Sequence, residues 1–227
     1  MNTPVASSGG IEVLIGNDLI QLPGFLDVPA QARGLVLFAH GSGSGRHSSR
    51  NQHVATAFRQ AGLATLLFDL LTGKEERLEA RTAHRRFDVP FLAGRLRLAT
   101  SWAQADRELA NLPLGYFGAS VGAAAALTAA AEEAAAVRAV VSRGGRPDLA
   151  GAALSRVAAP TLLIVGGNDR EVLALNREAF TELRSEKRLE VVPGASHLFE
   201  EPGTLDTAAA LAGAWFSRHL AREETLP

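Results

Sequence analysis

Cysteine is absent from this chain of 227 residues, and its absence excludes disulfide bonds, thiolate metal sites and a cysteine nucleophile. An excess of charge is lacking as well, because 23 Lys and Arg stand against 24 Asp and Glu. Neither nucleic acid nor an anionic membrane is therefore expected as a partner. With 47% apolar residues, a chain of this length can bury a core without covalent cross-links.

Targeting segments are also missing from the sequence. Residues 1–10 have neither the basic start nor the apolar stretch of a secretory signal. The most apolar long segment, residues 121–141, contains Glu132, Glu133 and Arg138, so we do not expect it to span a membrane. The sequence thus predicts a cytoplasmic protein and leaves a monomer or a homodimer open.

Short runs rich in Val, Leu and Ile alternate with longer helical stretches along the chain. Strands are expected at residues 11–15, 19–28, 34–39, 64–68, 114–117, 139–142, 161–165 and 189–192, and helices at 49–61, 90–110, 121–133, 148–156, 171–185 and 205–220. Residues 72–87, rich in Lys, Arg and Glu, are expected to form a solvated polar loop. This alternation predicts an α/β fold in a single domain, residues 1–227, with helices on both faces of a mostly parallel sheet. The first two strands should form an antiparallel edge.

A G-x-S-x-G segment, Gly118 to Gly122, lies between a predicted strand and a predicted helix. Functional groups of parallel sheets gather where strands end, and a tight strand-to-helix turn lifts a serine hydroxyl clear of the sheet. Glycine is favoured on both sides because larger side chains would clash, and the new helix points its positive end at the reaction site. Ser120 is therefore the candidate nucleophile; the alternative is a serine that only caps the helix.

A serine nucleophile needs a base, and the chain has six histidines. His197 follows the last predicted strand and completes the order nucleophile, acid, base. His84 and His219 have charged neighbours and are expected at the solvated surface, whereas His47 and His53 lie around the first helix. We therefore assign His197 as the base; the alternative is a hydrogen-bonded surface histidine.

A carboxylate should accept a hydrogen bond from the other nitrogen of this histidine, fix its tautomer and stabilise the imidazolium. Asp169 follows the predicted strand at 161–165 through a Gly-Gly-Asn turn and is our preferred candidate. Asp148 is the rival, but its place after Pro147 suits a cap of its own helix. Asp69 precedes Ser120 and so breaks the expected chain order.

Negative charge that develops on a carbonyl oxygen must be met by fixed hydrogen-bond donors. The backbone N–H of Val121, directly after the nucleophile, should be one donor. The second should come from the glycine-rich turn at residues 40–45, and we assign it to the N–H of Ser42. The turn does not fit a phosphate-binding loop, because its G-x-G-x-G spacing matches neither the dinucleotide nor the P-loop pattern and no Lys follows.

Basic side chains near these turns are candidates for substrate binding. His40 begins the glycine-rich turn, Arg46 and Arg50 lie in and after it, and Arg143 and Arg146 follow the sixth predicted strand. Guanidinium groups that face the pocket could hold a carboxylate or phosphate of the substrate. We expect His40, Arg46 and Arg143 in this role; the alternative is pairing of the arginines with surface acids.

The motifs HGSGSG, GASVG, GGND and GASH, in this order, resemble the α/β-hydrolase superfamily and specifically its dienelactone-hydrolase-like branch, over about residues 34–220. The resemblance implies an eight-stranded, mostly parallel sheet, no cofactor, and hydrolysis through an acyl-enzyme. Dienelactone hydrolases in the strict sense use a cysteine nucleophile, whereas this chain has Ser120 and no cysteine. That departure favours an ester or thioester over a dienelactone.

The sequence therefore predicts a serine hydrolase, carboxylesterase-like, that cleaves a small or soluble carboxylic ester, thioester or lactone. No metal site is predicted, and no segment is long and apolar enough for a large lid. Two alternatives stay open. An acyltransferase would use the same three residues with an alcohol or amine in place of water, and a non-catalytic binding protein would keep only the fold.

Overall fold

The computed structural model describes residues 10–17, 19–82 and 84–221. Most of the N-terminal segment in which the sequence predicts no secretory signal, residues 1–9, lies outside the described residues. The strands are β1 (Ile11–Gly16), β2 (Gln21–Asp27), β3 (Leu35–Ala39), β4 (Ala64–Phe68), β5 (Leu114–Ala119), β6 (Val137–Arg143), β7 (Thr161–Gly166) and β8 (Lys187–Val192). The helices are α1 (Ser49–Gln60), α2 (Gly73–Thr82), α3 (Val89–Ala105), α4 (Val121–Glu132), α5 (Arg170–Glu182) and α6 (Thr204–His219), with 3-10 segments η1 (Arg85–Phe87) and η2 (Pro147–Arg156).

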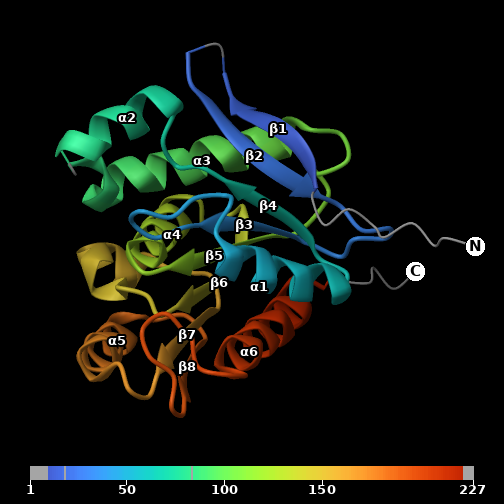
Figure 1. The fold of residues 1–227 in the computed structure, drawn as a ribbon. Helices are drawn as coiled ribbons and strands as arrows, with labels where there is room; N and C mark the ends of the chain where they lie inside the picture. Colours follow the sequence, from blue (N-terminus) through green and yellow to red (C-terminus); the bar gives the residue numbers. More distant parts are fainter. Residues whose placement is uncertain (1–9, 18, 83, 222–227) are drawn as a thin grey trace, which may run out of the picture.

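The strands form one eight-stranded sheet in the order β1-β2-β4-β3-β5-β6-β7-β8 (Figure 1). The strands from β4 to β8 along this order run parallel, whereas β2 is antiparallel to both β1 and β4. The predicted α/β fold with a mostly parallel sheet and an antiparallel N-terminal edge is confirmed.

Helices cover both faces of the sheet because alternate side chains of each buried strand point to opposite sides. In β3, Leu35 and Leu37 pack in the core that includes α3, α4, η2 and α5, whereas Val36 and Phe38 pack in the core that includes α1 and α6. Figure 1 shows the same division, with α1 and α6 together on one side of the sheet. No helix among the described residues is long and apolar enough to cross a bilayer.

The prediction of a solvated polar loop at residues 72–87 is wrong, because α2 and η1 occupy most of it. Glu79 of α2 is only 2% exposed and accepts hydrogen bonds from the backbone N–H groups of Arg85 and Arg86, at 2.8 and 3.1 Å. Glu75, one turn earlier, forms an ion pair with α3 at 2.6 Å. Polar contacts hold this helix in place of an apolar stripe, so hydrophobic periodicity does not reveal it.

Two predicted helices have different limits in the structure. The helix expected to reach residue 110 ends at Ala105, because the Asp106 carboxylate accepts hydrogen bonds from the next turn, from Glu108 N–H at 2.8 Å and Leu109 N–H at 3.2 Å. The helix expected at residues 148–156 is instead the 3-10 segment η2, interrupted at Gly151 with φ of 50°.

The parallel register brings the turns after several strands to one edge of the sheet. Ala39 at the end of β3 is paired with Gly118 of β5, and the neighbouring Ala119 is paired with Arg143 at the end of β6. Further along, Gly166 at the end of β7 is paired with Val192 at the end of β8. Residues far apart in the sequence therefore meet at this carboxyl edge.

Candidate active site

The turn between β5 and α4 holds Ser120 in a strained backbone conformation. Its φ of 51° and ψ of −128° lie in a region that residues other than glycine rarely occupy. A serine on such a turn presents its hydroxyl above the carboxyl edge of the sheet. The Ser120 side chain makes no capping hydrogen bond to α4 in the described structure. The capping alternative for this serine is therefore contradicted.

The two glycines of the G-x-S-x-G segment are required by close backbone packing. A Cβ on Gly118 would lie 2.4 Å from the Cα of Ala123. A Cβ on Gly122 would lie 2.2 Å from the carbonyl oxygen of Ala39, at the end of the adjacent β3. Both distances are shorter than any van der Waals contact, so only glycine lets the turn approach α4 and β3 this closely.

His197 and Asp169 meet across the turns that follow β7 and β8. The distance between His197 Nδ1 and Asp169 Oδ2 is 2.7 Å, and the Asp169 side chain is 14% exposed. A carboxylate can only accept, so Nδ1–H donates and Nε2 is left to accept a proton. Asp169 stands at the N-cap of α5 without a side-chain capping bond, because its carboxylate is directed to the histidine instead.

The rival carboxylates are engaged elsewhere. Asp148 forms a bidentate pair with Arg146 at 2.9 and 2.8 Å; it does not cap η2, whose N-cap is Arg146 itself. Asp69 accepts from the backbone N–H of Arg46 at 2.8 Å and pairs with its guanidinium. Of the three candidates, only Asp169 contacts His197 within the described residues.

A cavity of about 250 Å³ opens at this edge of the sheet, and both Ser120 and His197 line it. Gly41 and Ser42, from the turn after β3, form another part of its wall. No hydrogen bond joins Ser120 Oγ to His197 among the described residues. Such bonds often close only when substrate binds, and the two side chains already reach the same space from separate loops.

The predicted oxyanion donors lie beside the nucleophile. Val121 is the first residue of α4, and the first N–H groups of a helix have no acceptor inside it. Ser42 lines the cavity, and its neighbour Gly41 packs against the nucleophile, because a Cβ on Gly41 would lie 3.0 Å from Ser120 Cβ. The turn after β3 and the start of α4 therefore both adjoin Ser120, and the N–H groups of Ser42 and Val121 stay the predicted oxyanion donors.

Among the four arginines considered from the sequence, two line the cavity and two do not. Arg143 and Arg50 are part of its wall. Arg146 is paired with Asp148. Arg46, which the sequence predicts to bind substrate, is turned away: its guanidinium pairs with Asp69 and lies 5.4 Å from the centre of the Phe25 ring. The prediction for Arg46 is thus wrong, because an adjacent carboxylate neutralises its charge.

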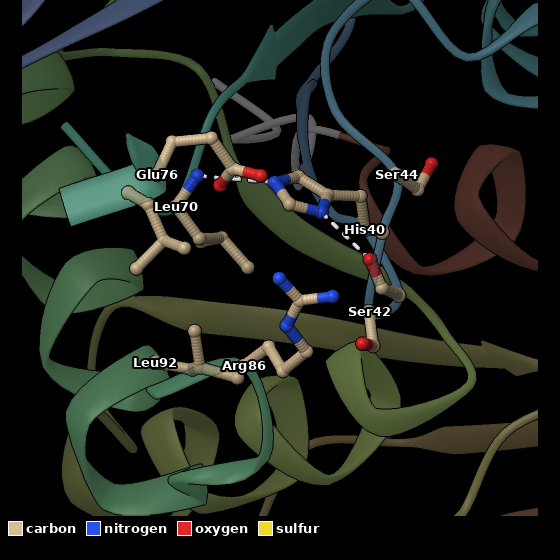
Figure 2. A pocket seen from close by; sticks show the side chains of 10 residues that line it. His40, Ser42, Ser44, Leu70, Glu76, Arg86 and Leu92 are labelled. Atoms are coloured by element: carbon tan, nitrogen blue, oxygen red, sulfur yellow. Dashed lines mark hydrogen bonds between the residues drawn. The ribbon is translucent and has the colours of Figure 1, made fainter. Parts of the chain in front are cut away.

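His40, also predicted to bind substrate, instead holds the glycine-rich turn in place. Its Nδ1 donates to the Gly41 carbonyl at 2.9 Å, and its Nε2 accepts from the Leu70 N–H at 3.1 Å (Figure 2). Burial lowers the pKa of His40, although its contact with Gly41 and the charges of Asp69 and Glu76 act in the opposite direction. A neutral ring suits this pair of contacts, because Nε2 can accept only when it carries no proton.

The hollow next to His40 is too small for a substrate. Figure 2 shows its wall, formed by His40 and Ser42 with Leu70, Glu76 and Arg86 around them. Its volume is about 20 Å³, which is room for roughly one water molecule. His40 is therefore not placed to bind substrate, contrary to the prediction from the sequence, and instead positions the glycine-rich turn.

Several residues of the cavity wall were not found by the sequence reasoning. Ser48 and Asn51, at the start of α1, line it together with Ser44 of the glycine-rich turn. Asn51 is 3% exposed, and its Oδ1 has no hydrogen-bond partner in the described part of the chain. These residues could have been predicted from the position of α1, because this helix begins directly after the glycine-rich turn at the carboxyl edge.

The remaining histidines lie away from this cavity. His53 pairs with Asp206 at 2.6 Å on the exposed surface, and His84 is exposed as predicted. The prediction of a solvated His219 is wrong: its side chain is 11% exposed and packs on Trp215, with ring centres 4.4 Å apart. Burial also lowers the pKa of His219.

Comparisons with known proteins show that this chain is similar to hydrolases. The sequence profile described as Alpha/beta hydrolase domain matches residues 32–212. A dienelactone hydrolase from Anabaena variabilis is 55% identical, with a TM-score of 0.91, over 92% of this chain and 97% of that one. Est1E from Butyrivibrio proteoclasticus is 15% identical, with a TM-score of 0.74, over 92% of this chain and 98% of that one, and shares the fold.

Curated relatives include a protein of Mycobacterium tuberculosis, which is 56% identical over 209 residues. It carries the provisional name phosphoribosyl transferase. The match covers 92% of this chain but only 46% of the relative, so the chain spans about half the length of the curated relatives it matches.

Proposed function

We propose that this chain, which belongs to the alpha/beta hydrolase domain family, is a serine hydrolase that cleaves a small or soluble carboxylic ester through an acyl-enzyme. The observation that carries the proposal is the 2.7 Å contact between His197 and Asp169, with His197 and Ser120 in the wall of one cavity. Ser120 is assigned as nucleophile, His197 as base and Asp169 as the group that orients the base. Thioesters and lactones are open to the same chemistry.

In the first half of the proposed reaction, Ser120 Oγ attacks the carbonyl carbon while His197 Nε2 takes the hydroxyl proton. The N–H groups of Val121 and Ser42 hold the oxygen that becomes negative. The bond from carbon to the leaving oxygen then breaks, and the leaving alcohol takes the proton from His197. Asp169 keeps the imidazole in the required tautomer throughout.

In the second half, a water molecule gives a proton to His197 Nε2 and attacks the acyl carbon. The bond to Ser120 Oγ breaks, the serine recovers its proton, and the carboxylic acid leaves. The cavity of about 250 Å³ is below the roughly 300–1,000 Å³ of sites for drug-sized ligands. A small acyl group is therefore proposed.

The Mycobacterium tuberculosis relative is named a phosphoribosyl transferase, which is a different activity from ester hydrolysis. This chain matches only 46% of that protein, whereas most of this chain matches the hydrolase profile, and 92% of it matches the dienelactone hydrolase of Anabaena variabilis. We therefore propose ester hydrolysis for the region that corresponds to this chain and assign no phosphoribosyl transfer to it.

Two other functions are compatible with the same fold. An acyltransferase would pass the acyl group to an alcohol or amine, and a binding protein would turn over no ester. Mass spectrometry of the products formed from p-nitrophenyl butyrate, with and without added glycerol or glycine, distinguishes them. Free butyric acid as the main product in every mixture supports the hydrolase, whereas a butyryl adduct of the acceptor supports the transferase.

The direct test compares the two His–Asp contacts found among the described residues. His197→Gln should lower kcat/KM for p-nitrophenyl esters by about 10³-fold or more, because the base is lost. His53→Gln is the matched control, since His53 pairs with Asp206 at 2.6 Å on the exposed surface, and it should stay within about twofold. Equal activity of the two variants would contradict the proposal, as would a wild type without turnover on any ester.

A further inference from the structure

Arg143 is a buried cation without an anionic partner among the residues that the structure describes. It is 5% exposed, it ends β6, and it lines the cavity of Ser120 and His197. Its Nε has no hydrogen-bond partner, and no ion pair joins it to a carboxylate in the part of the chain that the structure describes. The Phe199 ring, 5.6 Å from the guanidinium carbon, lies beneath it. A buried charge without an anionic partner is costly, and an anionic ligand that pairs with the guanidinium would remove this cost.

The same cavity wall has a second source of positive charge. Ser48, Arg50 and Asn51 bring the first turn of α1 to it, and a helix N-terminus is positive and rich in free N–H groups. That turn has no acidic residue. Arg50 contacts Glu200 only at 3.5 Å, and Glu200 is 64% exposed, so solvent weakens this pair.

The two arginines act on one another. Burial and, to a smaller extent, the charge of Arg50 together lower the pKa of Arg143 to about 10. Arg143 still carries its charge at neutral pH. Two cations and a helix N-terminus thus face one space, and an anion placed there would satisfy all of them.

We propose that the substrate is an ester that also carries an oxyanion, a carboxylate or a phosphate, which binds between Arg143, Arg50 and the first turn of α1. The inference rests on the proposed function, because it places the ester carbonyl of the same molecule at Ser120. Arg143 is paired in register with Ala119, the residue before Ser120, and neighbouring strands are about 4.8 Å apart. The charged group and the reacting carbonyl are therefore separated by only a few bonds.

The first experiment compares esters that differ only in charge. p-Nitrophenyl hydrogen succinate carries a carboxylate, p-nitrophenyl 3-phosphonopropionate carries a phosphonate, and p-nitrophenyl methyl succinate is neutral. The wild type should prefer at least one anionic ester over the neutral one by about tenfold or more in kcat/KM. The better of the two anionic esters identifies the source of the oxyanion. A wild type that cleaves the neutral ester as well as or better than both anionic ones overturns the proposal.

The second experiment uses two arginines of the same strand. Arg143→Gln should lower the ratio of kcat/KM for the anionic ester to kcat/KM for the neutral ester by about tenfold, mainly through the KM of the anionic ester. Arg138→Gln is the control, because Arg138 is exposed near the opposite end of β6, and it should keep the preference. An equal loss on anionic and neutral esters in Arg143→Gln contradicts the proposal. If that variant does not fold, Arg50→Gln takes its place, with the same two outcomes.

A binding measurement separates this inference from the proposed function. Calorimetry with the Ser120→Ala protein and succinate or inorganic phosphate should detect one site, and Arg143→Gln in the same background should abolish it. Binding without esterase activity in the wild type would refute the hydrolase and keep the anion site. Esterase activity without charge preference and without binding would refute the anion site and keep the hydrolase.

Discussion

Two hollows of nearly equal size lie at opposite ends of β5 and β6. The hollow at the carboxyl edge has about 250 Å³ and includes Ser120, Arg143 and His197 in its wall. The hollow at the amino edge has about 260 Å³ and includes Leu114 and Arg138. Volume therefore does not distinguish a candidate active site from an ordinary depression in this molecule.

The two hollows differ in whether their polar residues are exposed to water or are buried and strained. At the amino edge the polar side chains of Gln104, Asn111 and Arg138 are exposed to water. At the carboxyl edge, Arg143 is buried, its Nε has no hydrogen-bond partner among the described residues, and Ser120 is held at a φ of 51°. Strained and unsatisfied groups cost stability, and they persist mainly where function requires them. The contrast thus favours the carboxyl edge as the candidate active site.

The difference between the two hollows is tested most directly by removing one polar side chain from each and measuring ester turnover. Ser120→Ala should lower kcat for p-nitrophenyl esters by about 10⁴–10⁶-fold, because the attacking hydroxyl is lost, while circular dichroism shows an unchanged fold. Gln104→Ala, in the amino-edge hollow, should leave kcat within about twofold. Wild-type turnover in Ser120→Ala would remove this serine from the mechanism.

A smaller loss is expected from the carboxylate behind the histidine. Asp169→Asn should lower kcat by about 10²–10⁴-fold, because an amide can hold the imidazole in the wrong tautomer. Asp148→Asn is the control, since Asp148 also follows a strand of the sheet but pairs with Arg146, and its kcat should stay within about threefold. Steady-state kinetics of the two variants on one ester decide between the carboxylates, and a larger loss in Asp148→Asn would reverse the assignment.

Replacing Ser120 by glycine should abolish activity but relieve the backbone strain of this turn. Ser120→Gly should be inactive and yet more stable than Ser120→Ala by about 1–3 kcal/mol, because glycine occupies this backbone conformation without strain. Urea unfolding of both variants, followed by circular dichroism, measures the difference. A glycine variant that is less stable than the alanine variant would mean that the turn is not strained.

The unpartnered arginine gives a related prediction. Arg143→Met should raise the melting temperature by about 2–4 °C, which corresponds to about 1 kcal/mol in a chain of this size, because an apolar side chain replaces an unpaired buried charge. Differential scanning calorimetry without ligand tests this. A melting temperature lowered by several degrees would show that Arg143 supports the fold itself.

Glu79 provides the opposite case, a buried charge with all its partners. Burial alone would raise its pKa, but hydrogen bonds from Arg85, Arg86 and Thr82 lower it below the ordinary value. The ionised Glu79 should therefore stabilise the fold fully above about pH 4.3, the pKa of a glutamate in the unfolded chain. This stabilisation should fade as the pH falls through the lower pKa of Glu79 in the folded protein.

Glu79→Gln should lower the melting temperature at pH 7 and have no such effect in acid, whereas Glu76→Gln, at an exposed position of the same helix, should change the melting temperature little. An equal effect at both pH values would contradict the assignment.

The sequence predicted the sheet well because its strands are continuous apolar runs. The run at 34–39 becomes β3, in which every residue is buried, and the strand limits agree within a few residues throughout. Helix α2 was missed because its stability comes from hydrogen bonds to Glu79, and such contacts between separate segments leave no periodic signal.

The residues of the candidate site could be predicted where their position after a strand determines their place in the fold. Ser120, Asp169 and His197 each follow a strand, and parallel register brings such residues together. Side-chain direction was not predictable: Arg46 and Arg50 lie four residues apart, yet one pairs with Asp69 and the other lines the cavity. Nothing in a one-dimensional sequence shows which arginine of a turn meets a carboxylate.

The most direct test of the central claim, that Ser120 is activated by the His197–Asp169 pair, is covalent labelling. A fluorophosphonate reacts with an activated serine whatever the natural substrate. Peptide mapping by mass spectrometry should find one adduct per chain on Ser120, no adduct in Ser120→Ala, and a labelling rate at least 10²-fold lower in His197→Gln. Labelling at another serine, or equal rates in the wild type and His197→Gln, would contradict the account.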